Sequence, residues 1–135
     1  MILEWYVGFH EPTLRNLQGR IDPRGWLGHC EIWGYTDDDT WLFIDPQGAG
    51  TRVRVMHRHD DVLDQLDARF AICAAILKID GGDPSFRLPL HGGLSCASFC
   101  GHLLGIRALL PASLRRKLQR KGAKVIHEVE QGRSG

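Results

Sequence analysis

The sequence predicts an α+β fold in which an antiparallel sheet packs against a small number of helices. Strand-like segments dominate the first half of the chain, while helix-like segments come mostly later, and clusters of glycine, proline and aspartate separate them. A length of 135 residues and a hydrophobic content of 43% fit one domain, 1–135, with a core of its own.

The first three predicted strands include a hairpin. Residues 2–9 are a short apolar stretch and predict a strand, and the polar segment 12–25 that follows, with two prolines and two glycines, predicts a loop or short helix. Aromatic and branched residues then fill 28–35 and 41–46 on either side of an acidic turn at 37–39. This pattern is typical of a β-hairpin.

The middle of the chain predicts two more strands around a helix. Residues 51–58 alternate polar and apolar side chains, which predicts a strand with one solvent-exposed face. Residues 60–69 have apolar side chains at helical spacing, which predicts a short helix. The continuous apolar run 70–79 is either a buried strand or the rest of that helix, and the Gly/Asp/Pro terminator at 80–84 favours the strand. Residues 84–94 then predict a loop rich in proline and glycine.

The last part of the chain predicts two helices and a strand. Ser95 is a good N-cap, and Gly105 can end the helix that it begins in a left-handed conformation. The residues expected to bury one face of this helix are Phe99, Cys100, Leu103 and Leu104. A second helix over 111–122 begins at a proline, 123–129 predicts a final strand, and 130–135 predicts a disordered tail.

Composition excludes several classes of partner. A formal net charge of +1 gives no general attraction to nucleic acid or to an anionic membrane, and the basic run 115–121 is better explained as a solvated helix face than as a phosphate contact. The N-terminal segment lacks the features of a signal peptide, and no apolar run approaches the ~20 residues that span a bilayer. The four cysteines have no secreted disulfide spacing, which favours a reducing cytosol. The four tryptophans are expected in the core and sheet, with Trp26 a candidate groove wall beside His29.

Cys96 is the candidate nucleophile. It lies in the first turn of the helix that Ser95 caps, where backbone N–H groups are unpaired and the positive end of the helix dipole lies. We expect this setting to favour the thiolate, which is the nucleophilic form of cysteine. The alternative is that Cys96 fills the core as a small hydrophobic residue. The segment by itself leaves both interpretations open.

His29 and Asp45 are the candidates for the base and the group that orients it. His29 begins the first strand of the predicted hairpin, and Asp45 ends the second strand. Because the start of one strand lies beside the end of the next, we expect Asp45 to accept a hydrogen bond from the His29 ring. The pair would complete a triad with Cys96. The alternative is that Asp45 belongs to a simple turn and that His29 is a surface residue.

His57 and His59 form a competing cluster, which Asp60 and Asp61 follow. Two histidines one residue apart point the same way on a strand and, with an acidic residue, can hold a metal ion. The spacing falls short of two-metal hydrolase motifs, and no cysteine pair completes a structural zinc site. We therefore predict a polar rim at a strand end, and no metal.

Three segments resemble the circularly permuted papain-like superfamily, the NlpC-type cysteine peptidases and amidases, and in particular small proteins of that group encoded by phages and prophages. The segment GHCEIWGYTDDDTWLFIDP looks like the strand that carries the family's histidine and the strand that ends in the orienting residue. SCASFCGHLLGI resembles its cysteine helix, and LLPASLRRKLQRKGAKVI resembles the segment that follows. The order histidine, acid, cysteine matches the permuted arrangement.

The resemblance implies a single papain-like domain in which Cys96 is the nucleophile, His29 the general base and acid, and Asp45 the orienting residue. It implies hydrolysis of peptide or peptidoglycan amide bonds without a cofactor, in the bacterial cytoplasm or in a phage virion. The alternative that it carries is a non-catalytic component of a phage virion or tail, with other virion proteins as partners.

Overall fold

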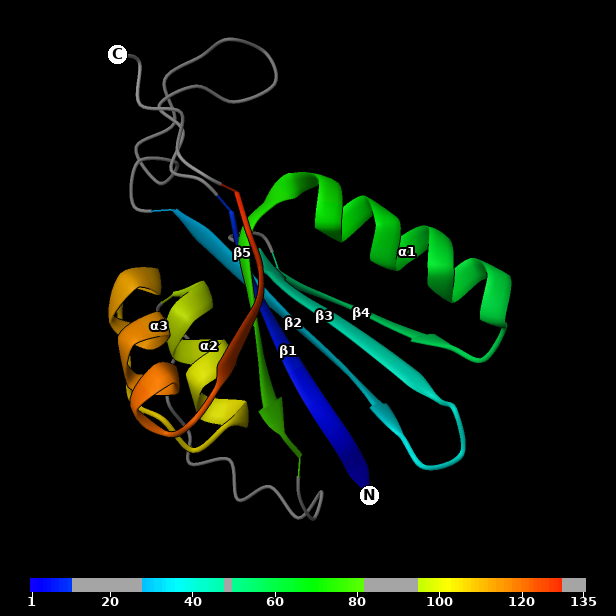
Figure 1. Ribbon diagram of the computed structural model, residues 1–135, viewed down its shortest axis with the longest axis horizontal. Coiled ribbons are helices and arrows are strands. Elements are labelled where there is room, and N and C mark those ends of the chain that lie inside the picture. The colour runs from blue at the N-terminus through cyan, green and yellow to red at the C-terminus, as the bar shows by residue number, and fades with distance from the viewer. Residues whose placement is uncertain (11–27, 48–49, 82–94, 130–135) are drawn as a thin grey trace, which may run out of the picture.

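The computed structural model describes residues 1–10, 28–47, 50–81 and 95–129. These residues form a six-stranded antiparallel sheet and three helices, which confirms the predicted α+β class (Figure 1). The predicted loops at 12–25 and 84–94 and the predicted tail at 130–135 lie outside the described residues, as does Trp26. Within the described ranges, the helices are too short or too polar for any of them to cross a membrane.

The sheet places its first strand in the middle. The strands are β1 (Ile2–His10), β2 (His29–Thr36), β3 (Trp41–Gln47), β4 (Gly50–Met56), β5 (Cys73–Asp80) and β6 (Lys124–Glu128). Their order in the sheet is β4-β3-β2-β1-β5-β6, and each neighbouring pair is antiparallel. The predicted hairpin is β2 and β3, and the strand predicted to follow it is β4.

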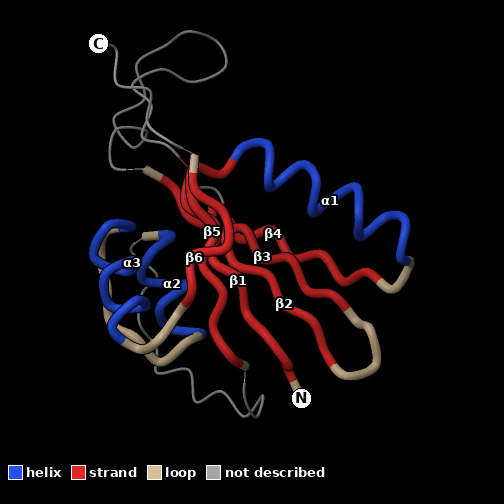
Figure 2. The backbone as a smooth tube through the Cα atoms, in the orientation of Figure 1, coloured by secondary structure: helices blue, strands red, loops and turns tan. Residues whose placement is uncertain are grey.

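Helices cover both faces of the sheet (Figure 2). The helices are α1 (His59–Ile72), α2 (Cys96–Leu103) and α3 (Pro111–Arg120). α2 and α3 lie on one face, and α1 lies on the other. Successive side chains of a strand point to opposite faces of the sheet, so each strand contributes alternate residues to two separate cores.

Each core contains side chains from the sheet and from its own helices. The core under α2 and α3 includes Trp5, Val7, Cys30, Ile32, Leu77, Ala97, Cys100, Leu114 and Leu118. The core under α1 includes Trp33, Phe43, Val62, Cys73 and Ile76. Trp5 and Trp33 are almost fully buried, so these two rings pack the sheet as the sequence predicts.

α1 is longer than predicted and includes the first residues of the apolar run 70–79. Residues 70–72 complete the helix, and β5 begins at Cys73. The prediction was wrong for these three residues because an apolar run does not show by itself where a helix passes into a strand. Phe70 and Ile72 remain well exposed, whereas Cys73 is buried in the sheet.

α2 begins with the predicted cap. The Ser95 hydroxyl accepts from the Ser98 N–H at 3.0 Å, and the Ser98 hydroxyl accepts from the Ser95 N–H at 3.1 Å, which together form a capping box. At the other end, the chain folds back over Gly101, whose carbonyl accepts from the Ile106 N–H at 2.7 Å. A Cβ at Gly101 would collide with the Ile106 carbonyl oxygen, so only glycine allows this close return.

The buried face of α2 includes the predicted Cys100, and Leu103 and Leu104 pack against the same core, but smaller residues make the closest contact with the sheet. The fully buried residues are Ala97, Cys100 and Gly101, whereas Phe99, Leu103 and Leu104 are only partly buried. The periodicity selected the larger apolar side chains, but the small residues allow α2 to lie close to β2.

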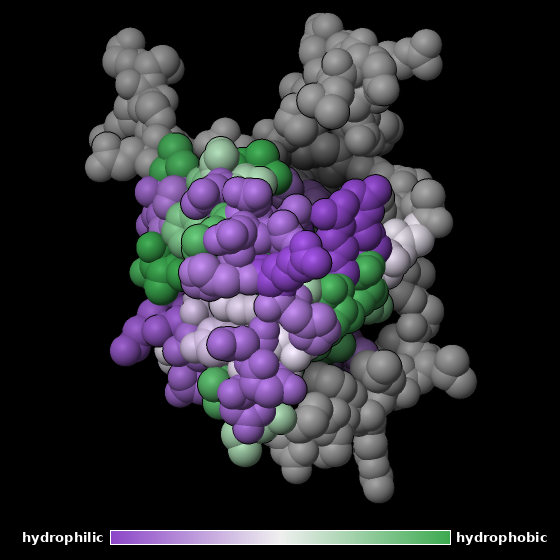
Figure 3. All heavy atoms as spheres, turned by 90° about the vertical axis from the view of Figure 1, so that its right-hand side faces the viewer, coloured by the Kyte–Doolittle hydropathy of each residue, from purple (hydrophilic) through white to green (hydrophobic). Residues whose placement is uncertain are grey.

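α3 turns its basic residues away from the core. Leu114 and Leu118 are buried, while Arg115 forms an ion pair with Glu128 at 2.7 Å, and Arg116 is exposed. The run 115–121 is therefore a solvated helix face in large part. The side of the molecule seen in Figure 3 is mostly hydrophilic, with separate apolar patches.

Candidate active site

His29 and Asp45 are brought together by the β2–β3 hairpin. The register pairs Ile32 with Ile44, so Asp45 lies diagonally across from His29 on the neighbouring strand. Side chains in this diagonal relation share a face and come within reach of each other when one of them is long. Nε2 of His29 lies 2.6 Å from Oδ1 of Asp45, which confirms the predicted hydrogen bond.

Cys96 comes to the same place from α2. It is the first residue of the helix and is partly buried. Its thiol lies close enough to the His29 ring for each group to shift the pKa of the other. Nε2 of the same ring faces Asp45. The structure thus brings both Asp45 and Cys96 to His29.

His29 is protonated at neutral pH. Burial lowers the pKa of the ring, but the interactions of the ring with Asp45 and with Cys96, of which the hydrogen bond to Asp45 is the largest, outweigh burial and raise the pKa to about 10. The imidazolium is therefore the resting form, with Asp45 accepting one of its N–H groups.

The expectation that Cys96 favours the thiolate is wrong. A hydrogen bond with the Cys30 thiol and burial raise the pKa of Cys96 to about 12, and the opposing effect of His29 is smaller. Burial beside another thiol therefore dominates at this position. At neutral pH the site holds an imidazolium and a neutral thiol.

Two further thiols lie behind Cys96. Cys30 and Cys100 are fully buried, and the Cys100 sulfur lies 4.0 Å from the Cys30 carbonyl oxygen. Hydrogen bonding with Cys100 is the largest effect that raises the pKa of Cys30. The sequence contains two signals for this cluster: Cys30 follows His29, and Cys96 and Cys100 are four residues apart on a helix. The four cysteines are free.

A buried charged network that the sequence patterns did not predict lies beside His29. Glu31 is 5% exposed, and its Oε1 forms an ion pair with Nε of Arg69 at 2.6 Å. Its second oxygen lies 3.0 Å from Nε2 of His10. The rings of His10 and His29 meet edge to face at 5.1 Å between centroids. The available signal was an acidic residue inside an apolar strand, because a buried carboxylate requires a partner.

One group of potential metal ligands occurs among the described residues. The ligand atoms of His10, His29 and Glu31 all lie within 4.8 Å of one another. Asp45 and Arg69 already bind His29 and Glu31 at 2.6 Å, so a metal ion here would have to displace an ion pair. The network therefore fits protein partners better than a metal.

The competing histidine cluster has a different environment. Nδ1 of His57 lies 3.3 Å from the hydroxyl of Thr40, and His59 begins α1 at the surface. In the part of the chain that the structure describes, neither residue belongs to a group of three potential metal ligands.

Comparison of the chain with protein-family models, with curated protein sequences and with solved structures gives no match.

Proposed function

We propose that this chain is a cysteine hydrolase of the permuted papain-like type that cleaves peptide or peptidoglycan amide bonds. The observation that carries the proposal is that His29 meets two partners: the Asp45 carboxylate lies 2.6 Å from its Nε2, and the Cys96 thiol, at the start of a helix, lies close enough to shift the pKa of the ring. A nucleophile, its base and the group that orients the base are the minimum for covalent acyl transfer.

The order and placement of these groups also support the family proposal. His29 and Asp45 come from adjacent antiparallel strands, and Cys96 comes later in the chain, on a helix that packs against that sheet. This matches the permuted order of the resemblance. The proposal includes the phage or prophage origin that the resemblance implies.

The reaction begins with attack by the Cys96 thiolate on the amide carbonyl carbon. A C–S bond forms, and the carbonyl electron pair moves onto oxygen, where the backbone N–H of Cys96 can donate to it. His29 then gives its proton to the amide nitrogen, the C–N bond breaks and an amine leaves. His29 next takes a proton from water, hydroxide attacks the thioester carbon, and the carboxylic acid is released with the thiolate restored. Asp45 keeps the ring oriented and stabilises the imidazolium.

The rate of this reaction is expected to rise on the alkaline side. The reactive pair of thiolate and imidazolium has one proton fewer than the resting pair, and both groups have raised pKa values, about 10 for His29 and about 12 for Cys96. Below about pH 9 the initial rate should therefore increase roughly tenfold per pH unit, as the loss of one proton requires.

The test is acylation by p-nitrophenyl acetate, followed by assays on peptidoglycan stem peptides. We expect an acetyl group on Cys96, located by peptide mapping, and a loss of at least about a hundredfold in rate for Cys96→Ser and for His29→Ala. Cys73→Ala is the matched control, because Cys73 lies under α1 in the other core, and it should react as the wild type does. Acetylation of Cys73 and Cys96 at equal rates at pH 9 would refute the proposal.

A second candidate is a non-catalytic component of a phage particle that keeps this fold. The neutral Cys96 thiol at physiological pH favours it, since a binding protein needs no thiolate. This candidate requires the chain to copurify with assembled particles, and Cys96→Ala to do so as well. If the protein separates completely from the assembled particles on a density gradient, this second candidate is excluded.

A further inference from the structure

A small pocket opens on the α1 side of the sheet, beside the candidate triad. Its volume is about 180 Å³, and it is lined by Phe43, Asp45, Arg52, Arg54, Gln65 and Arg69. A water molecule takes about 30 Å³ in the liquid, so the pocket has room for a group of several atoms. Arginines make up half of its lining, and Asp45 connects it to His29.

Arg69 is fixed at the bottom of this pocket. Its Nε forms an ion pair with Oε1 of Glu31 at 2.6 Å, and its Nη1 donates to the Gln65 side-chain oxygen at 2.8 Å. Its guanidinium carbon lies 4.4 Å from the Phe43 ring centroid and 5.8 Å from that of Trp33. These contacts hold the Arg69 guanidinium group in place before a ligand binds, and they leave Nη2 available to that ligand.

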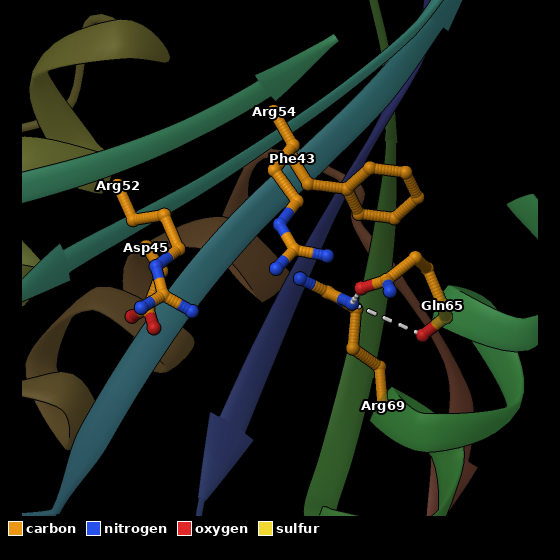
Figure 4. Close-up of a pocket in the computed structure, with 6 residues that line it drawn as sticks. All are labelled: Phe43, Asp45, Arg52, Arg54, Gln65 and Arg69. Atoms are coloured by element: carbon orange, nitrogen blue, oxygen red, sulfur yellow. Dashed lines mark hydrogen bonds between the residues drawn. The ribbon is translucent and has the colours of Figure 1, made fainter. Parts of the chain in front are cut away.

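Arg54 and Arg52 bring two further cations to the same pocket. They are the cross-strand partners of Phe43 and Asp45 on β4. Figure 4 shows the guanidinium groups of Arg54 and Arg69 side by side, with Arg52 beside Asp45. Two guanidinium groups in contact repel each other unless an anion lies between them.

The carboxylates of the described residues do not balance these charges. Glu31 is paired with Arg69, and the charge of Asp45 is met by the protonated His29. Arg52 and Arg54 form no ion pair with any described residue. The pocket therefore has an excess of positive charge, and guanidinium groups bind carboxylate and phosphate in a bidentate way.

We propose that this pocket binds an oxyanion group, a carboxylate or a phosphate, on the ligand of this protein. Arg54 and Arg69 bind the oxyanion from two sides. Arg52 partly shields the oxyanion from the negative charge of Asp45. Binding does not depend on the hydrolase activity, so the two proposals can fail separately.

The experiment measures binding by calorimetry, with inorganic phosphate in one arm and N-acetylglutamate in the other, at constant ionic strength set with sodium chloride. We expect saturable binding in at least one arm, and the stronger arm identifies the source of the oxyanion. Arg54→Gln should weaken that binding by about tenfold or more, because it removes a charged hydrogen bond. Arg54 is exposed on an edge strand, so this variant should fold.

Arg116→Gln is the matched control, since it removes the same charge from an exposed position on α3, on the opposite face of the sheet. It should bind as the wild type does. Failure of both probes to bind at 10 mM (roughly 3 kcal/mol at most), or equal weakening by Arg54→Gln and Arg116→Gln, would overturn the proposal. Binding without hydrolysis would support the pocket and refute only the proposed activity.

Discussion

The Cys30 thiol sets the protonation of the candidate nucleophile. It follows His29 in β2 and points to the opposite face of the sheet, into the core where α2 packs. Its hydrogen bond with Cys96 is the largest of the effects that raise the pKa of Cys96, and burial is the next. A single buried side chain thus opposes the thiolate that the helix start and His29 favour.

Replacing Cys30 by alanine should lower the pKa of Cys96. The thiolate then becomes populated at a lower pH, and alkylation of Cys96 by iodoacetamide should accelerate by about tenfold at pH 8 if the pKa falls by one unit. The measurement is the alkylation rate against pH, with the modified residue assigned by peptide mapping.

Cys73→Ala is the control for this shift. Cys73 is a buried thiol whose pKa is raised to about 12, chiefly by burial, but it lies in the core under α1. Its removal should leave the profile of Cys96 unchanged. An identical profile for the wild type and Cys30→Ala would show that burial alone holds Cys96 in the thiol form.

At the scale of the elements, α2 depends on its cap to present Cys96. The Ser95 hydroxyl accepts from the Ser98 N–H and also donates to the Leu109 carbonyl at 2.9 Å. It therefore fixes the first turn of α2 and ties it to the segment that leads into α3. The position of Cys96 relative to the hairpin depends on both bonds.

Ser95→Ala should lower the free energy of unfolding by about 1–2 kcal/mol, because it removes an N-cap and a second hydrogen bond. Urea unfolding measures the loss. Ser113→Ala on α3 is the matched control, since α3 has no side-chain cap, and it should change stability by less than about 0.5 kcal/mol. Equal losses in the two variants would contradict the role given to the cap.

At the scale of the whole molecule, one ion pair joins the two layers on the α1 side. Arg69 reaches from α1 to Glu31 on β2 and packs over two aromatic rings of the sheet. Glu31 is almost fully buried, so its charge depends on this partner and on His10. A buried charge that loses its partner is much more costly than a surface one.

Arg69→Ala should therefore destabilise the protein by about 3–5 kcal/mol. Thermal and urea unfolding at pH 7 measure this loss. The double variant Glu31→Gln with Arg69→Met should be clearly more stable than Arg69→Ala, because it leaves no unpaired charge in the core. If the double variant is as unstable as Arg69→Ala, the cost comes from lost packing of Arg69 and not from the charge on Glu31.

The sequence predicts contacts best where one chain segment contains both partners. The bond between His29 and Asp45 follows from a hairpin whose register is fixed by its own strands, and the cap at Ser95 depends on the next three residues. The Cys30–Cys96 and Glu31–Arg69 contacts join elements far apart in the chain. Whether such elements meet depends on packing across the sheet, which periodicity does not specify.

The central position of β1 has a consequence for synthesis on the ribosome. β1 pairs with β2 on one side and with β5 on the other, and β5 ends about 70 residues after β1 does. At about 5–20 residues per second, β1 waits roughly 4–14 s for its second partner. During that time its apolar side chains, Trp5, Val7 and Phe9 among them, have no complete core to enter. Nascent chains of this protein should accordingly bind chaperones until β5 has emerged.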